Sequence, residues 1–146
     1  MKPPAGYLLR MEARVLEAIF PGTTDVPGLC RERALPFLAM FHDQSPRTLR
    51  LALHASAIAF VMATPLTVGA LRPALLLAPE VLARHTEACA GHRVYLLRQA
   101  LLMLKTAGGF CWGADQAVRS SMSVAGYKPD PLKAGCAPAT SEESGP

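Results

Sequence analysis

The strongest pattern of apolar positions in the chain lies within residues 91–113. Apolar residues recur there at steps of three and four, which is one face of an α-helix: Val94, Leu97, Leu101 and Leu104. Further apolar neighbours widen this face until Arg98 and Lys105, one heptad apart, form a narrow polar strip. A helix this apolar must be covered by other helices or by a partner protein.

The same pattern predicts where this helix ends. Gly108 and Gly109 interrupt it, and glycine readily adopts the left-handed conformation that ends helices. The next three residues, Phe110, Cys111 and Trp112, are then expected to lie outside the helix. Aromatic residues at such a place either fold back onto the core or face a partner, and the pattern leaves both alternatives open.

Proline and glycine divide the rest of the chain into further apolar segments. We predict helices over residues 7–20, 28–42, 46–63, 79–90 and 116–123, with one or two short helices between 66 and 77. In the first of these helices the charges fall between the apolar positions, as in a helix at the protein surface. The chain is therefore predicted to be all-α, an irregular bundle of about five to seven helices.

Local residues predict how several of these helices begin. Ser45 and Pro46 suit an N-cap and a first helical position, and Asp115 suits the cap of a short helix. Pro36 lies inside the second predicted helix, so that helix either starts near it or bends there. We expect one domain over residues 1–132 and a disordered tail over 133–146, which is small, polar and proline-containing.

Residues 51–69 carry no formal charge, which raises the alternative of a membrane span. Polar residues and Pro65 interrupt the stretch, so a buried helix that breaks at Pro65 is the favoured interpretation. Whether the stretch meets lipid or lies in the core stays open. At the N-terminus, alternating charges break up any apolar segment and no twin arginine is present, so the chain is expected in the cytoplasm.

Charge and chemistry exclude several classes of function. The 15 Lys and Arg against 11 Asp and Glu leave a net charge of +4, and the basic residues are scattered, which argues against nucleic-acid binding. The four cysteines form no CxxC motif, and the four histidines show no compact metal spacing. His85 and Cys89 stand four residues apart as half of a zinc site, although a structural role is favoured. Asp43 and Asp115 are best explained as helix caps. We therefore predict no catalytic, cofactor-binding or metal-binding residue in this chain.

Two stretches carry a family resemblance. The first is residues 12–37, EARVLEAIFPGTTDVPGLCRERALPF, and the second ends at residue 129 with LLMLKTAGGFCWGADQAVRSSMSVAGYKP. Together they resemble the small third subunit of gluconate 2-dehydrogenase-type flavoenzymes, and the helical region that precedes the flavin domain in long-chain alcohol oxidases. The matching residues are Gly109-Phe110, Ala114-Asp115, Val118-Arg119 and Gly126-Tyr127.

The resemblance implies a non-catalytic accessory subunit that binds and stabilises a larger oxidoreductase of the glucose–methanol–choline type. That partner would hold FAD and act on an alcohol or sterol-like substrate. The chain departs from exported members of the family because no twin-arginine signal is present, so it is expected in the cytoplasm or peripheral to the inner membrane through its partner. We expect the partner interface to include Arg98, Lys105, Phe110, Trp112, Asp115, Arg119 and Tyr127.

The two cations of the polar strip have alternative roles. Arg98 and Lys105 could instead pair with buried acids or extend along the helix to reach solvent. For the whole chain, a free-standing helical binder of an apolar ligand is the second functional hypothesis, because a pocket between bundle helices would serve that purpose. A small enzyme that uses a histidine or a cysteine is the third.

Overall fold

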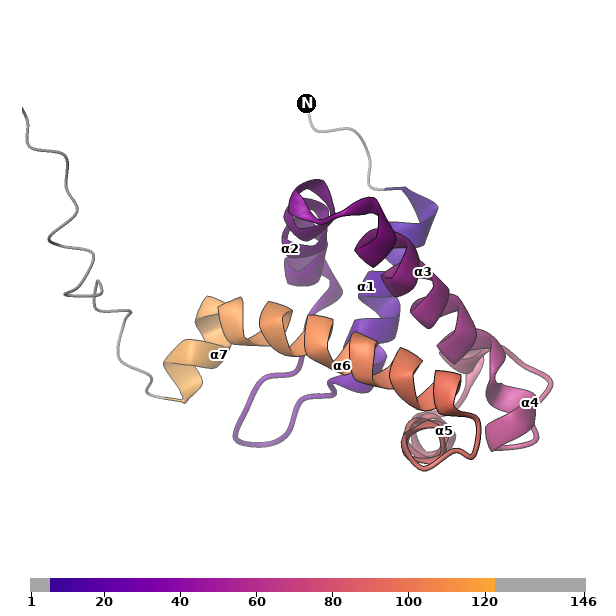
Figure 1. Cartoon of the computed structure of the whole chain (residues 1–146). Helices are drawn as coiled ribbons and strands as arrows, with labels where there is room; N and C mark the ends of the chain where they lie inside the picture. The colour runs from indigo at the N-terminus through magenta and orange to yellow at the C-terminus, as the bar shows by residue number, and fades with distance from the viewer. Residues whose placement is uncertain (1–5, 123–146) are drawn as a thin grey trace, which may run out of the picture.

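The computed structural model describes residues 6–122, and these residues form an all-α bundle (Figure 1). Its elements are α1 (Tyr7–Ile19), α2 (Arg31–Gln44), α3 (Arg47–Met62), α4 (Thr64–Thr67), the 3₁₀-helix η1 (Ala74–Leu76), α5 (Pro79–Ala90), α6 (Tyr95–Ala114) and α7 (Gln116–Ser121). The prediction of an all-α bundle of five to seven helices is therefore confirmed. The predicted tail, 133–146, and the predicted end of the domain at residue 132 lie outside the described residues.

The bundle is arranged around α6, the helix with the strongest apolar pattern. It crosses the molecule and packs most extensively against α3, and it also contacts α1, α2, α5 and α7 (Figure 1). Its inner side joins the core through Leu97, Ala100, Leu101, Leu104, Ala107 and Cys111. Of the two predicted alternatives, cover by other helices or by a partner, the first is confirmed along that side.

The predicted end of α6 at Gly108 and Gly109 is wrong, because the helix continues through both residues to Ala114. Among the described residues, Gly69 is the one glycine with a positive φ. Gly108 serves a different purpose, because a Cβ built there would overlap the ring of Phe20. The glycine lets this aromatic ring lie against the backbone of α6, and the residues that follow remain helical.

The ends of the other helices agree with the sequence to within a few residues. Asp115 caps α7 as predicted, since its side chain accepts a hydrogen bond from the backbone N–H of Ala117 at 2.9 Å. The predicted cap at Ser45 is wrong: α3 begins at Arg47, Pro46 takes the N-cap place and no side chain caps the helix. Pro46 has an extended backbone (ψ 148°), so the helix can begin only after it. α2 runs from Arg31 to Gln44 with Pro36 inside it.

The uncharged stretch 51–69 has two different sides in the structure. In α3 the inner side lies in the core through Leu53, Ala57 and Phe60. The outer side leaves other apolar residues of α3 exposed. None of the described helices combines the length and the apolar character that crossing a membrane requires.

Candidate functional site

The most concentrated group of chemically active side chains comes from three different helices. Glu12 of α1, His42 of α2 and His54 of α3 place one potential ligand atom each within 4.8 Å of one another. α1 packs against both α2 and α3, which brings the three residues together (Figure 1). We call this group the Glu12–His42–His54 cluster.

The carboxylate of Glu12 is the centre of the cluster. Its Oε2 lies 2.7 Å from Nε2 of His42, and its Oε1 lies 2.5 Å from Nδ1 of His54. The two imidazole rings stack, with their centroids 4.8 Å apart. The Glu12 side chain is fully buried, whereas 10% of the His42 side chain and 23% of the His54 side chain are exposed. The cluster therefore has a closed inner end at Glu12 and an open end at His54.

Burial shifts the protonation of all three groups toward their neutral forms. It raises the pKa of Glu12 to about 8. It lowers the pKa of His42 and of His54, and the positive charge of Arg50 lowers both pKa values further. A neutral carboxyl can donate its proton to one imidazole and accept an N–H from the other, an arrangement in which the cluster buries no net charge.

The sequence did not predict this cluster. The charges of α1 were expected between its apolar positions, at the surface, and for Glu12 that expectation is wrong because its side chain has no exposed area. The available signal was the position of Glu12 three and four residues before Val15 and Leu16, both of which are buried. A carboxylate on the apolar side of a helix requires a polar partner from elsewhere in the fold.

The second pair of potential ligands, His85 and Cys89, is occupied by internal contacts. Nε2 of His85 donates to the carbonyl oxygen of Phe60 at 2.9 Å, and its Nδ1 lies 2.5 Å from Oγ1 of Thr67. Sγ of Cys89 lies 3.8 Å from the same ring, and burial raises the pKa of the Cys89 thiol to about 11. This chemistry suits a structural role in the packing of α5 against α3 and α4.

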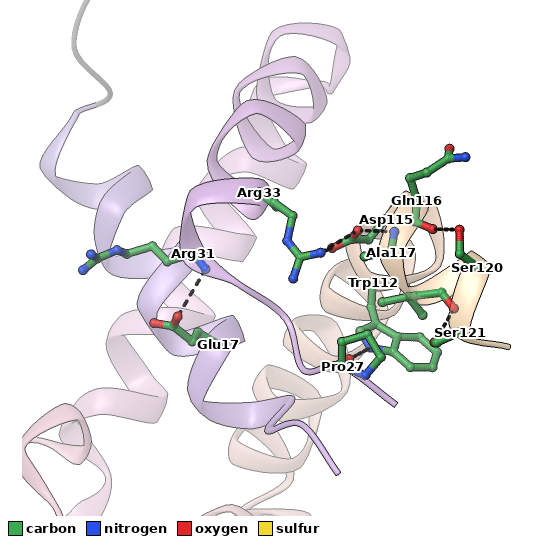
Figure 2. Close-up of polar contacts among 11 residues, drawn as sticks. Glu17, Pro27, Arg31, Arg33, Trp112, Asp115, Gln116, Ala117, Ser120 and Ser121 are labelled. Atoms are coloured by element: carbon green, nitrogen blue, oxygen red, sulfur yellow. Dashed lines mark hydrogen bonds and ion pairs between the residues drawn. The ribbon is translucent and has the colours of Figure 1, made fainter. Parts of the chain in front are cut away.

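Two of the predicted partner residues have internal partners at the junction of α2, α6 and α7 (Figure 2). Asp115 forms an ion pair with Nη1 of Arg33 at 2.9 Å, in addition to its cap on α7. Nε1 of Trp112 donates a hydrogen bond to the carbonyl oxygen of Pro27 at 3.0 Å. Trp112 is half-buried against the core, so it holds the loop between α1 and α2 to α6.

The remaining predicted partner residues lie apart from this junction or outside the described range. Arg98, Lys105 and Phe110 are exposed on α6, and Arg119 is half-exposed on α7. Nη1 of Arg98 donates to the carbonyl oxygen of His92 at 2.9 Å. Within residues 6–122, neither Arg98 nor Lys105 forms an ion pair with a buried acid. Tyr127 lies outside the described residues.

A row of apolar side chains on the outer side of α3 was not predicted as a surface. Leu51 is 66% exposed, Ile58 is 45% exposed and Met62 is 64% exposed. Steps of seven and four residues place them on one face of the helix, and Ala55 and Ala59 on the same side are also exposed. We call Leu51, Ile58 and Met62 the α3 stripe. Hydropathy alone does not separate a helix face that meets the core from a face that docks a partner. The uncharged stretch between residues 51 and 62 therefore reads as fully buried, although one of its faces is exposed.

Comparison of the chain with models of known protein families, with curated proteins and with solved structures found no match. The assignment of a function therefore depends on the geometry of the chain and on its short motifs in residues 12–37 and 97–129.

Proposed function

We propose that this chain is a non-catalytic accessory subunit that binds and stabilises a larger flavin-dependent oxidoreductase of the glucose–methanol–choline type. In this proposal the partner holds FAD and acts on an alcohol or sterol-like substrate. The accessory chain contributes an apolar helical surface, and its own fold supplies the rigid support for that surface.

The observation that carries the proposal is the α3 stripe. Single apolar residues on a protein surface are ordinary, but a row of large ones along one helix face is typical of an interaction site. The opposite side of α3 is anchored in the core by Leu53 and Phe60, each 1% exposed. The stripe is therefore presented on a well-packed helix, so binding a partner through it would require little ordering of the chain.

The outer side of α6 extends the apolar character to the helix that packs most closely on α3. Tyr95 is 60% exposed, Leu102 is 56% exposed and Phe110 is 61% exposed. Arg98 and Lys105 follow the same helix on its exposed side. Aromatic, aliphatic and arginine side chains together are typical of protein–protein interfaces, where they provide contact area and polar contacts at the rim.

The class of partner comes from the sequence motifs of residues 12–37 and 97–129. In the structure, the described parts of these stretches meet: Trp112, from the second, bonds to the carbonyl of Pro27, from the first. The two stretches thus form one structural unit, α1, its loop, α2 and the end of α6, which supports treating them as a single motif.

Co-expression tests the proposal. The chain should be produced alone, and together with a glucose–methanol–choline-type flavoprotein from the same genome. We expect poor solubility alone, and a complex of defined stoichiometry with the yellow flavoprotein when both are present. A soluble monomer that does not co-purify with the flavoprotein would contradict the proposal. If that monomer binds apolar small molecules, it would support the alternative of a free-standing helical binder.

A further inference from the structure

We propose that the Glu12–His42–His54 cluster is a binding site for a divalent first-row transition metal ion, and that Zn²⁺ is the ion its donors suit best. The site is independent of the proposed partner and lies at the junction of α1, α2 and α3. It would hold one ion through two imidazole nitrogens and one carboxylate oxygen.

The donor set points to the kind of ion. Two histidines and one carboxylate are a ligand combination that zinc and other divalent transition metals use in proteins. Ca²⁺ and Mg²⁺ prefer sites built from oxygen, so the two imidazoles argue against them. The donors come from three helices, and the fold rather than a local motif determines their positions.

The distances are compatible with a small rearrangement around an ion. Metal–ligand bonds of about 2.0–2.1 Å would place neighbouring donor atoms about 3.3 Å apart in a tetrahedral site. The donors of the cluster lie 2.5 and 2.7 Å apart across the two Glu12 contacts, and all within 4.8 Å of one another. An ion that enters between them would lengthen the two Glu12 contacts by less than about 1 Å and would draw the two imidazole nitrogens together by up to about 1.5 Å.

Proton balance is simple for this exchange. Nε2 of His42 and Nδ1 of His54, which face Glu12, would bind the ion through their lone pairs. The ring that donates an N–H to Glu12 would first exchange this proton through water for one on its other nitrogen, so that both facing nitrogens carry lone pairs. Each bound imidazole is then neutral with its proton on the nitrogen away from the ion, and any proton on Glu12 leaves to water. The bound state combines one carboxylate with a divalent ion, so burial of the carboxylate is compensated.

The surroundings of the cluster provide access from solvent and one positive charge that would repel the ion. The exposed edge of His54 opens toward solvent, whereas Glu12 closes the inner end. Arg50, near enough to affect both histidines, is the cation that would weaken the site. Three protein ligands leave at least one position for water or another ligand, as in zinc sites that are not fully closed. The ion would also connect α1, α2 and α3, so its binding should stabilise the fold.

Metal binding can be measured on the full chain without an affinity tag. After treatment with a chelator, the protein is titrated with Zn²⁺ by calorimetry, and with Co²⁺ by visible spectroscopy. We expect one ion per chain and weak visible bands of nitrogen and oxygen ligation. The melting temperature should rise by roughly 5–10 °C when free Zn²⁺ is about a hundredfold above Kd.

Matched variants assign the site. His54 is the most exposed of the three ligands, so His54→Gln disturbs the core least. It should weaken Zn²⁺ binding by at least about tenfold, because loss of a residue that merely supports a metal ligand already costs that much. Glu12→Gln should do the same while keeping the shape of the side chain. His92→Gln is the control, because His92 lies outside the cluster in the turn before α6 and accepts a hydrogen bond from Val94. Circular dichroism of each metal-free variant checks that it is folded.

Each outcome decides the question. Loss of binding in His54→Gln and Glu12→Gln, with normal binding in His92→Gln, supports the site. Binding that survives both cluster variants, or no binding and no change in melting with Zn²⁺, overturns it. A strong near-ultraviolet charge-transfer band with Co²⁺ would also overturn it, because that band indicates thiolate ligation and the chain has free cysteines, including the half-buried Cys30.

Discussion

Gly108 provides the sharpest test of how α6 is packed. Its α-carbon faces the ring of Phe20, and an added Cβ would overlap Cε2 and lie 2.9 Å from Cδ2 and 3.1 Å from Cζ of that ring. Gly108→Ala must therefore displace the ring, which belongs to the layer packed against the core. The neighbouring Gly109 is in the same helix, and a Cβ there would meet no atom within 4 Å.

The two glycines form a matched pair, since alanine improves helix propensity by about 1 kcal/mol at either position. Gly109→Ala should raise the free energy of unfolding by up to about 1 kcal/mol. Gly108→Ala gains the same propensity but overpacks the core, at a cost of about 1–3 kcal/mol. The difference between the two variants, about 1–3 kcal/mol, therefore isolates the contact with Phe20.

Urea unfolding followed by far-ultraviolet circular dichroism measures both variants. The double variant Phe20→Leu with Gly108→Ala completes a cycle, because a smaller side chain at position 20 should relieve most of the added cost. Equal stability of Gly108→Ala and Gly109→Ala would show that the ring of Phe20 does not restrict position 108. A Gly108→Ala penalty that persists in the Phe20→Leu background would show the same.

Three further predictions concern internal contacts and pH. Trp112→Ala should lower the chain's own free energy of unfolding by about 3 kcal/mol or less, because it removes the packing of the half-buried indole and its hydrogen bond to Pro27. Unchanged stability with weaker partner binding would instead identify Trp112 as an interface anchor. Asp115→Ala should cost about 1–2 kcal/mol in urea unfolding through the lost cap, whereas Asp115→Asn should keep the cap and lose only the ion pair with Arg33. Burial lowers the pKa of His85 in the folded chain, so the unfolded chain binds more protons below pH 6.5 and stability should fall as pH falls through that value. Thermal melting of wild type and His85→Gln between pH 5 and 8 checks this, and an equally steep pH dependence in both would contradict it.

The helices were predictable because their ends depend on local residues. α5 begins at Pro79 and ends at Ala90, before Gly91, as the sequence predicted. Asp115 caps α7 because its side chain reaches a backbone N–H two residues away. Propensity and capping act over one or two turns, so a single sequence contains the information.

Two of the errors, at Gly108 and at Glu12, have one physical cause, which is contact between residues far apart in the chain. Gly108 looked like a helix end because the ring of Phe20 that fills the space beside it comes from another part of the sequence. Glu12 looked like a surface charge because its partners, His42 and His54, stand 30 and 42 residues away. Local spacing carries no information about which helix will lie opposite.

The failure to predict the α3 stripe has a related cause. Residues 51–62 have an inner and an outer face of similar hydropathy, so the pattern could not separate the face that meets the core from the exposed one. The exposure of Leu51, Ile58 and Met62 depends on which face of α3 packs against α6, and the sequence pattern does not contain this information.

The proposed binding of a larger flavoprotein to the α3 stripe is tested most directly by a matched pair of charge substitutions. Ile58 is 45% exposed on the stripe, and Met40 is 51% exposed on a different helix, α2. Each is changed to Glu, and the affinity of the co-expressed flavoprotein for each variant is measured by surface-immobilised binding. We expect Ile58→Glu to weaken binding by about thirtyfold or more, equivalent to about 2 kcal/mol, while Met40→Glu stays within about twofold of wild type. Equal affinities for Ile58→Glu and wild type, with both proteins folded, would contradict the proposed docking surface.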